Sequence, residues 1–401
     1  MSLNTRHTQL SFFLDIFFKE NRFPFFYIEI TNSFFNKVIY KVNPDKKFNL
    51  NFDVYSIRDV PNYLVPKYIK NKHLKCLTAP LFQGYLINLM PFKNIEDYFD
   101  NKLGKPRKSQ LKRYKKRLDL CITPEYKIFY GKISKNEYDH IFKELVLITE
   151  RRFAQKKELN FELPYLELYQ SMMYPLVLDK KASIFVIYHE NKPINITLNF
   201  IDDVTIYHWN SCYDIDYQMF NLGHINMVNH LEWAFKNGFK LFDMGRGDFL
   251  HKRKYVNESY MYNEHIIYNS KSSYSSIIAH LKILKLKTRY TVIQFLKKFN
   301  LHLWYGYYAK YKYKIIESKN VKPVSNMVTI DNDIYEIPKL ENLVLIDIND
   351  SEYAFLIKSL NYFLHKNQEF FKNVNIYMDK ENEQTYYFSG IKKNQKIIIL
   401  K

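Results

Sequence analysis

The chain has 401 residues, of which 47% are hydrophobic, and it contains only 9 glycines and 13 prolines. This composition excludes a disordered chain and long flexible linkers, and the length is sufficient for two domains of ordinary size. The formal net charge of +19 arises from 60 Lys and Arg against 41 Asp and Glu, and it predicts either an anionic partner or a well-solvated, lysine-rich surface.

The three cysteines, Cys76, Cys121 and Cys212, lie far apart in the sequence. Their spacing fits neither a metal site nor a disulfide framework, so we expect no metal and a reducing compartment. Asp15 and Lys19 interrupt the apolar N-terminal stretch, and no apolar run approaches the roughly 20 residues of a membrane span. We therefore expect a cytoplasmic protein, either free or peripheral to the inner face of the membrane.

Residues 1–105 are predicted to form an N-terminal α/β half. Short strands rich in aromatic residues, such as Phe25–Ile30 and Gly84–Leu89, alternate there with turn signals. A helix is expected over 107–118, where nine basic residues and no acidic one occur between Lys102 and Arg117. This basic stretch marks the junction to a second half, residues 106–270.

The second half is predicted to begin with helices over 137–153 and near 164–178, followed by strands. In the first helix, the residues at helical spacing are Tyr138, Ile141, Phe142, Leu145 and Thr149. Runs of β-branched and aromatic residues at 183–189, 194–200 and 204–212 are separated by short polar turns. This pattern predicts an antiparallel meander.

Gly223 opens an amphipathic helix that is expected to end near Lys236 and Gly238, and a strand at 239–245 follows. The residues that lie roughly one turn apart on its apolar side are Ile225, Val228, Leu231 or Glu232, and Phe235. The unpaired N–H groups and the positive end of the helix dipole at Gly223, His224 and Ile225 suit a pyrophosphate. A glycine before a helix is also an ordinary turn residue.

Residues 271–320 are predicted to contain basic amphipathic helices, because ten basic and no acidic residues lie between Ile266 and Ile316. Such a helix can lie on an anionic membrane, or its leucine face can cover the core while its lysines are solvated. Residues 321–401 are expected to form a separate small α/β module, with a strand near Leu343–Ile348 and a helix from Asp350 to His365.

The string FDMGRGDFLHKRKY at 242–255 concentrates charge at the end of a strand that reads as buried. Its charged residues include Asp243, Arg246, Asp248, Lys252 and Arg253. Charges at such a place are costly to bury unless they pair or bind a ligand. The string therefore predicts a binding site or, alternatively, a network of ion pairs that caps the strand.

The same string resembles the DFGRGDEPYKRRF signature of the CelD-like acetyltransferases, a branch of the GNAT superfamily related to the Fem-type aminoacyltransferases. The matching residues are Asp243, Gly245, Arg246, Gly247, Asp248 and Lys252. The resemblance covers about residues 80–260. It departs from the family at Asn221 and Leu222, where the family has Ser and Pro, and at Phe249 and His251, which replace an acidic residue and a tyrosine.

The resemblance implies an α/β (α+β) fold with two GNAT-like halves, mixed central sheets and an acyl-CoA donor. It implies that the donor's pantetheine pairs with the backbone from Trp209 to Cys212, and that its pyrophosphate lies on Gly223, His224 and Ile225. It also implies that Arg152, Arg246 and Lys252 bind an acceptor carboxylate or phosphate.

Acyl transfer needs a base for the attacking group and an acid for the leaving thiolate. The candidates are Asp243 or Asp248 as base or orienting group, with His208 and Tyr207 as proton carriers. Strand alternation places Tyr207 and Trp209 on one face and His208 on the other, so these side chains do not all point into one site. Packing is the alternative role for a histidine or tyrosine in such a strand.

The resemblance implies surface-polysaccharide chemistry, with an amino sugar or another phosphate-bearing molecule as acceptor of an acetyl or acyl group on an amine or hydroxyl. One alternative is a Fem-like transferase that uses aminoacyl-tRNA, for which the charge of +19 would supply phosphate contacts. Another is a non-enzymatic protein on a decayed acyltransferase fold that binds membrane or nucleic acid.

Overall fold

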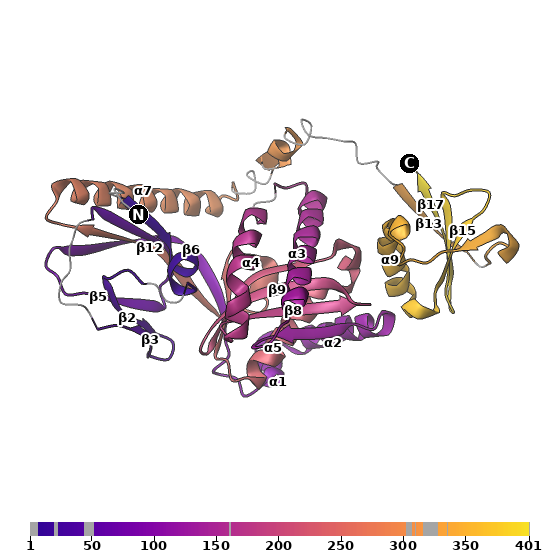
Figure 1. The fold of residues 1–401 in the computed structure, drawn as a ribbon, viewed down its shortest axis with the longest axis horizontal. Helices are drawn as coiled ribbons and strands as arrows, with labels where there is room; N and C mark the ends of the chain where they lie inside the picture. The colour runs from indigo at the N-terminus through magenta and orange to yellow at the C-terminus, as the bar shows by residue number, and fades with distance from the viewer. Residues whose placement is uncertain are drawn as a thin grey trace. The chain divides into compact units, whose positions relative to one another are not determined.

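The structure is a computed structural model that describes residues 7–19, 23–43, 52–159, 162–301, 307–308, 310–315, 328–334 and 336–400. The chain divides into two compact units, and each unit combines two segments (Figure 1). Unit 1 comprises Met1–Pro91 and Lys240–Tyr307, and unit 2 comprises Phe92–Phe239 and Tyr308–Lys401. The two units are described separately below.

Unit 1 contains strands in the order β1–β4–β12–β6–β11. The strands are β1 (His7–Ser11), β4 (Val54–Pro61), β12 (Glu258–Asn269), β6 (Leu74–Asn88) and β11 (Leu241–Arg246). β1 is parallel to β4, whereas β12 is antiparallel to both β4 and β6, and β11 is antiparallel to β6. A separate three-stranded sheet consists of β3 (Lys37–Lys41), β2 (Tyr27–Asn32) and β5 (Leu64–Tyr68).

The helix α7 (Ser273–Lys298) lies along the strands of unit 1 (Figure 1). Its buried residues Ala279 and Ile283 belong to a cluster with Val54, Ala79 and Ile266, from β4, β6 and β12. A short helix, α6 (Leu250–Arg253), follows β11. The helix α7 therefore packs on β4, β6 and β12.

Unit 2 contains four antiparallel strands in the order β10–β9–β8–β7, with helices on both faces. Figure 1 shows α3 and α4 on one face and α2 and α5 on the other. The strands are β7 (Glu125–Phe129), β8 (Ala182–His189), β9 (Lys192–Asp202) and β10 (Thr205–Tyr213). The helices are α1 (Ile95–Tyr98), α2 (Lys105–Cys121), α3 (Lys135–Lys156), α4 (Leu163–Leu178) and α5 (Leu222–Lys236).

The C-terminal part of unit 2 is a five-stranded antiparallel sheet with one α-helix, α9 (Ile357–Asn367). The strands are β13 (Val328–Ile334), β14 (Leu343–Leu345), β15 (Asn375–Asp379), β16 (Thr385–Ser389) and β17 (Asn394–Leu400). Leu360 and Phe363 of α9 share one hydrophobic cluster with Leu118 of α2, Ile225 of α5 and Phe220 of the 3-10 turn Ile215–Phe220.

The predicted mixed α/β class is confirmed, and so are the meander and the helices over 107–118, 137–153 and 164–178. In the C-terminal part, a 3-10 turn at Ser351–Leu356 precedes α9, where we expected one helix from Asp350 to His365. The described residues between 7 and 88 are mostly strands, with a π-helical turn at Phe12–Phe17, where we expected an α/β unit of short strands and turns. The buried face of α5 also differs from the prediction, because Asn226 and His230 are buried whereas Val228 and Phe235 are half-buried. Among the described residues, no helix is long and apolar enough to cross a membrane.

Close packing at Gly84 gives a stability prediction. A Cβ at Gly84 would lie 2.3 Å from Cζ of Tyr260 on the neighbouring strand, whereas a Cβ at Gly223 would have no neighbouring heavy atom of the described structure within 4 Å. We expect Gly84→Ala to lower the free energy of unfolding by about 2 kcal/mol through overpacking, measured by urea denaturation. Gly223→Ala is the matched control, and equal losses for the two variants would contradict the packing.

Candidate functional site

The N-terminus of α5 has the features of an anion-binding site. The preceding residue, Asn221, has a left-handed φ of 58°, and its side chain does not cap the helix. The amides of His224 and Ile225 both donate to the Asn221 carbonyl, at 2.9 and 3.3 Å. The first-turn amides of Leu222 and Gly223 have no carbonyl of the helix to bond, and first-turn amides of this kind can donate to an anion at the end of a helix.

A guanidinium lies beside this helix end. Nη2 of Arg107, on α2, is 3.1 Å from Nδ1 of His224, and Nη1 of Arg107 donates to Gln110 at 2.5 Å. The His224 ring stacks on Tyr114 of α2, with the ring centroids 5.9 Å apart. Arg107 was not among the site residues predicted from the sequence, although it lies in the basic stretch between Lys102 and Arg117. A positive charge next to the positive end of a helix dipole favours a phosphate-sized anion.

Strand β10, which leads toward α5, has an irregular register. His208 pairs with Asn199 and Asn210 pairs with Leu198, so Trp209 is an extra residue opposite β9. Such a bulge removes one residue from the ladder and bends the strand. The Trp209 ring packs edge-on against Phe200 and Tyr169, with centroids 5.3 and 6.3 Å apart.

A buried polar network holds α5 on β9. Nδ2 of Asn226 donates to Oγ1 of Thr197 at 2.6 Å, and Nδ2 of Asn199 lies 3.1 Å from Nε2 of His230. Nδ1 of His230 bonds the Asn226 carbonyl at 2.7 Å, so this nitrogen carries the proton and Nε2 accepts. Burial lowers the pKa of His230 to about 3. This network could have been anticipated from the sequence, because polar residues alternate along the buried strand β9 at Asn195, Thr197 and Asn199.

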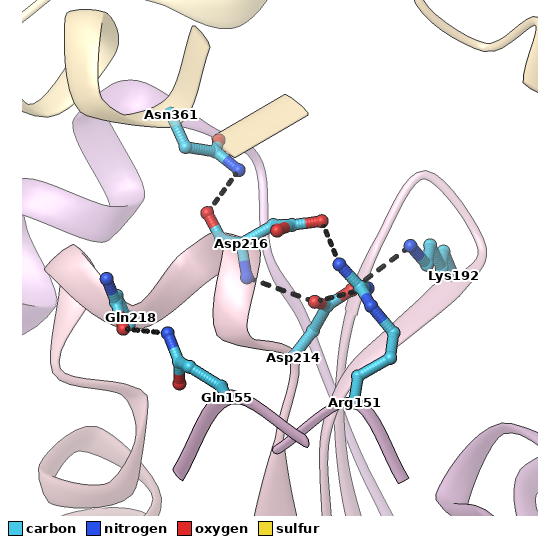
Figure 2. Close-up of polar contacts among 7 residues, drawn as sticks. All are labelled: Arg151, Gln155, Lys192, Asp214, Asp216, Gln218 and Asn361. Atoms are coloured by element: carbon cyan, nitrogen blue, oxygen red, sulfur yellow. Dashed lines mark hydrogen bonds and ion pairs between the residues drawn. The ribbon is translucent and has the colours of Figure 1, made fainter. Parts of the chain in front are cut away.

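A second cluster, drawn in Figure 2, fixes the turn between β10 and α5. Arg151 of α3 bonds Asp214 at 2.8 Å and Asp216 at 2.6 Å, and Lys192 lies 3.1 Å from Asp214. The Asp214 side chain is fully buried, whereas the Arg151 side chain is 41% exposed. Nδ2 of Asn361, on α9, donates to the Asp216 carbonyl at 3.1 Å. The turn before α5 is thus held from α3, β9 and α9.

Arg152 and Cys212, two predicted site residues of unit 2, lie together at the end of β10. Nη1 of Arg152 donates to the Ser211 carbonyl at 3.2 Å and lies 3.9 Å from Sγ of Cys212. The Arg152 guanidinium also lies over the Tyr213 ring, 4.7 Å from its centroid. Tyr207 is buried, and the half-buried His208 ring lies 5.6 Å from the His230 ring.

In unit 1, Asp243 of β11 is a buried acceptor. It is 1% exposed and accepts from the hydroxyls of Tyr63 and Tyr260 and from the Gly245 amide, all at 2.7 Å. The Tyr260 and Tyr262 hydroxyls are 2.6 Å apart. Burial raises the pKa of Asp243, and these three donors oppose that effect. Asp243 therefore fixes two tyrosines and the start of the following turn.

Lys252 closes the turn after β11. Its Nζ donates to the carbonyls of Met244 at 2.5 Å and Arg246 at 2.7 Å, and burial lowers its pKa to about 8. Gly245 and Gly247 have φ values of 66° and 99°, which a glycine adopts without strain. The turn is therefore held by a buried ammonium in contact with backbone carbonyls.

The remaining charges of this turn are more exposed. Asp248 and Arg253 form a two-pronged ion pair with both N–O distances at 2.5 Å, and the Arg253 hydrogen bond lowers the pKa of Asp248. The exposed Arg246 lies over the Phe82 ring, 5.7 Å from its centroid. Asp243, Arg246 and Lys252 thus meet at one turn, with Asp248 and Arg253 paired beside them. Among the described residues, no group of three or more His, Cys, Asp or Glu side chains could hold a metal ion.

Residues 106–253 match the family model of the acetyltransferase (GNAT) domain. The matched region runs from α2 to α6 and so contains the β10 bulge, the N-terminus of α5 and the turn after β11. No curated protein matches the chain at a significant level.

The chain also resembles several solved structures at low sequence identity. FemX is 10% identical over 57% of this chain and 75% of that chain, with a TM-score of 0.39. L-PGS from Bacillus licheniformis is 12% identical over 59% and 73% of the two chains, with a TM-score of 0.33. A conserved protein of unknown function from Bacteroides thetaiotaomicron is 8% identical over 54% and 70%, with a TM-score of 0.37.

The Arg151 cluster gives a prediction about stability. Arg151→Ala leaves the buried Asp214 with Lys192 as its remaining cation, so we expect a loss of about 2 kcal/mol in the free energy of unfolding. Lys135→Ala is the control on the same helix, because its pair with Asp139 is exposed and should be worth about 0.5 kcal/mol or less. Urea denaturation measures both, and equal losses would contradict a structural role for Arg151.

His230 gives a prediction about pH. Between its ordinary pKa of 6.5 and its folded value of about 3, the unfolded chain binds a proton that the folded chain does not. Acidification therefore lowers stability, by up to about 1.4 kcal/mol per pH unit for this residue. When the pH falls from about 7.5 to about 5.5, we expect the free energy of unfolding of His230→Gln to decrease by about 1 kcal/mol less than that of wild type.

Urea denaturation at the two pH values measures this difference. His280→Gln is the matched control, because the exposed His280 ring makes the same contact four residues back, to the Ser276 carbonyl at 2.7 Å. The same acid dependence in His230→Gln and wild type would contradict the buried, neutral ring.

Proposed function

We propose that this protein transfers an acetyl or other acyl group from acyl-CoA to an amine or hydroxyl acceptor. The observation that carries the proposal is the N-terminus of α5, where first-turn amides, a helix dipole and Arg107 converge. The match of residues 106–253 to the GNAT domain supports it, because this anion-binding end lies within the matched region. The chemistry that acyl-CoA supplies is an activated thioester carbonyl.

The sequence assigned the donor's pyrophosphate to Gly223, His224 and Ile225. Because the amides of His224 and Ile225 donate to the Asn221 carbonyl, the proposal assigns it to the first-turn amides of Leu222 and Gly223, with Arg107 providing a countercharge. Gly223 suits this contact because it presents no side chain and its neighbourhood is open among the described residues. The amide groups of pantetheine are assigned to the backbone between Trp209 and Cys212, where Trp209 lies outside the ladder with β9.

The proton carriers proposed from the sequence differ in accessibility. Tyr207 is buried at 3% exposure, whereas His208 is half-buried, so His208 is our candidate base in unit 2. Asp243 is enclosed by two tyrosine hydroxyls and a backbone amide, which favours an orienting role over a direct one. Asp248 remains a candidate base, with Arg253 holding it in the ionised form.

For the acceptor we propose an amino sugar or another precursor of surface polysaccharide that carries phosphate, as in the CelD-like acetyltransferases. Arg246 is the candidate contact for its phosphate, because the guanidinium is exposed. The ammonium of Lys252 already donates to two backbone carbonyls, so we propose that Lys252 stabilises the turn. Arg152 contacts the Ser211 carbonyl and the Tyr213 ring, and it is a second candidate for an acceptor anion.

A charge substitution at Gly223 tests donor binding. An aspartate there adds a negative charge to the first turn of α5, which favours the helix dipole but repels a pyrophosphate. We expect acetyl-CoA to raise the melting temperature of wild type, and Gly223→Asp to weaken acetyl-CoA binding by at least about tenfold without lowering the melting temperature of the free protein.

The matched control is Asn136→Asp, which places the same charge in the exposed first turn of α3. Calorimetric titration with acetyl-CoA measures affinity. If wild type does not bind acetyl-CoA, or if both aspartate variants bind it equally well, the donor assignment is wrong. Absence of binding to acetyl-CoA together with binding to aminoacyl-tRNA would favour the Fem-like alternative.

A further inference from the structure

Helix α7 has an apolar stripe that faces solvent. Ile277, Leu281 and Leu284 are 59%, 61% and 62% exposed. The stripe continues through Val292 and Phe295, which are 50% and 59% exposed. Since these positions recur every three to four residues, apart from one interval of eight between Leu284 and Val292, they share one side of the helix.

The stripe lies opposite the side of α7 that packs on unit 1. The buried residues of α7 are Ser275, Ala279 and Ile283, and beyond Ile283 the described helix has no further buried residue. The sequence left open whether the leucine face covers the core, and the exposure of Leu281 and Leu284 contradicts that alternative for these two residues. Packing within unit 1 therefore does not explain the stripe.

The charges of α7 are all of one sign. The helix contains six basic residues and no acidic one: Lys282, Lys285, Lys287, Arg289, Lys297 and Lys298. Lys282 lies 3.4 Å from Glu264 of β12, and the other five are exposed. By helical spacing, Lys285 flanks the stripe on one side, and Lys287 and Lys298 flank it on the other. Apolar side chains bordered by lysines match the boundary between the acyl chains and the headgroups of a bilayer.

We propose that α7 binds flat on an anionic lipid membrane, with the stripe Ile277–Leu281–Leu284–Val292–Phe295 inserted at the interface. A second copy of α7 fits the stripe less well, because pairing two such helices would bring lysines together with no acidic residue of α7 to neutralise them. Nucleic acid would neutralise the lysines but would leave the apolar stripe in water. This proposal goes beyond the acyl transfer proposed above and does not depend on it.

Vesicle flotation with the full-length protein tests the proposal. We expect wild type to float with vesicles of equal parts phosphatidylglycerol and phosphatidylcholine, and to remain in solution with phosphatidylcholine alone or at high salt. The triple variant Ile277→Ser, Leu281→Ser and Leu284→Ser should bind anionic vesicles at least about tenfold more weakly. Because these side chains are exposed, its melting temperature should match that of wild type.

The matched control variant replaces three equally exposed apolar residues of the C-terminal part, as Leu340→Ser, Leu345→Ser and Ile391→Ser. It should float like wild type, whereas Lys285→Glu with Lys287→Glu should not float. Three results would overturn the proposal: wild type that fails to float, a triple variant that floats as well as wild type, or a wild-type dimer that the triple variant dissociates while neither protein binds vesicles. Light scattering without lipid identifies the last case.

Discussion

Hydrogen bonds between buried polar side chains determine how α5 packs on β9. Asn226 and His230 lie on the buried face of α5, and they satisfy their hydrogen bonds with Thr197 and Asn199 of β9. Because a buried polar group without a partner costs free energy, this pattern permits one register of the helix on the strand. The register in turn sets where the first-turn amides lie relative to Arg107. The geometry of the anion-binding end therefore depends on the hydrogen bonds between α5 and β9.

The C-terminal sheet and α9 contribute to the same part of unit 2. They share a hydrophobic cluster with α2, α5 and the turn before α5, and Asn361 bonds the backbone of that turn. Arg151 and Lys192 hold the turn from the other elements. The C-terminal sheet and α9, whose role the sequence did not indicate, thus help to hold the turn that leads into the proposed donor site.

Local patterns were sufficient to predict most helices and strands of unit 2, because periodicity depends on neighbours along the chain. Contacts between distant residues were not predictable in this way. Arg107 and His224, or Arg151 and Asp214, meet only after folding. The apolar pattern also predicted Val228 and Phe235 on the buried face of α5. The polar Asn226 is buried instead, because its side chain donates a hydrogen bond to Thr197. In the motif after β11, the sequence indicated a charged site but not that Lys252 would bond carbonyls.

The strand order of unit 1 has a consequence for synthesis on the ribosome. Among the described strands, β4 and β6 are neighbours in the sheet only through β12, which follows the whole of α1 to α5 in the chain. Until β12 leaves the ribosome, β4 and β6 each have an unpaired edge on the side where β12 will later bind. Since exposed edges invite pairing with other chains, this period is the one in which a chaperone would be most useful.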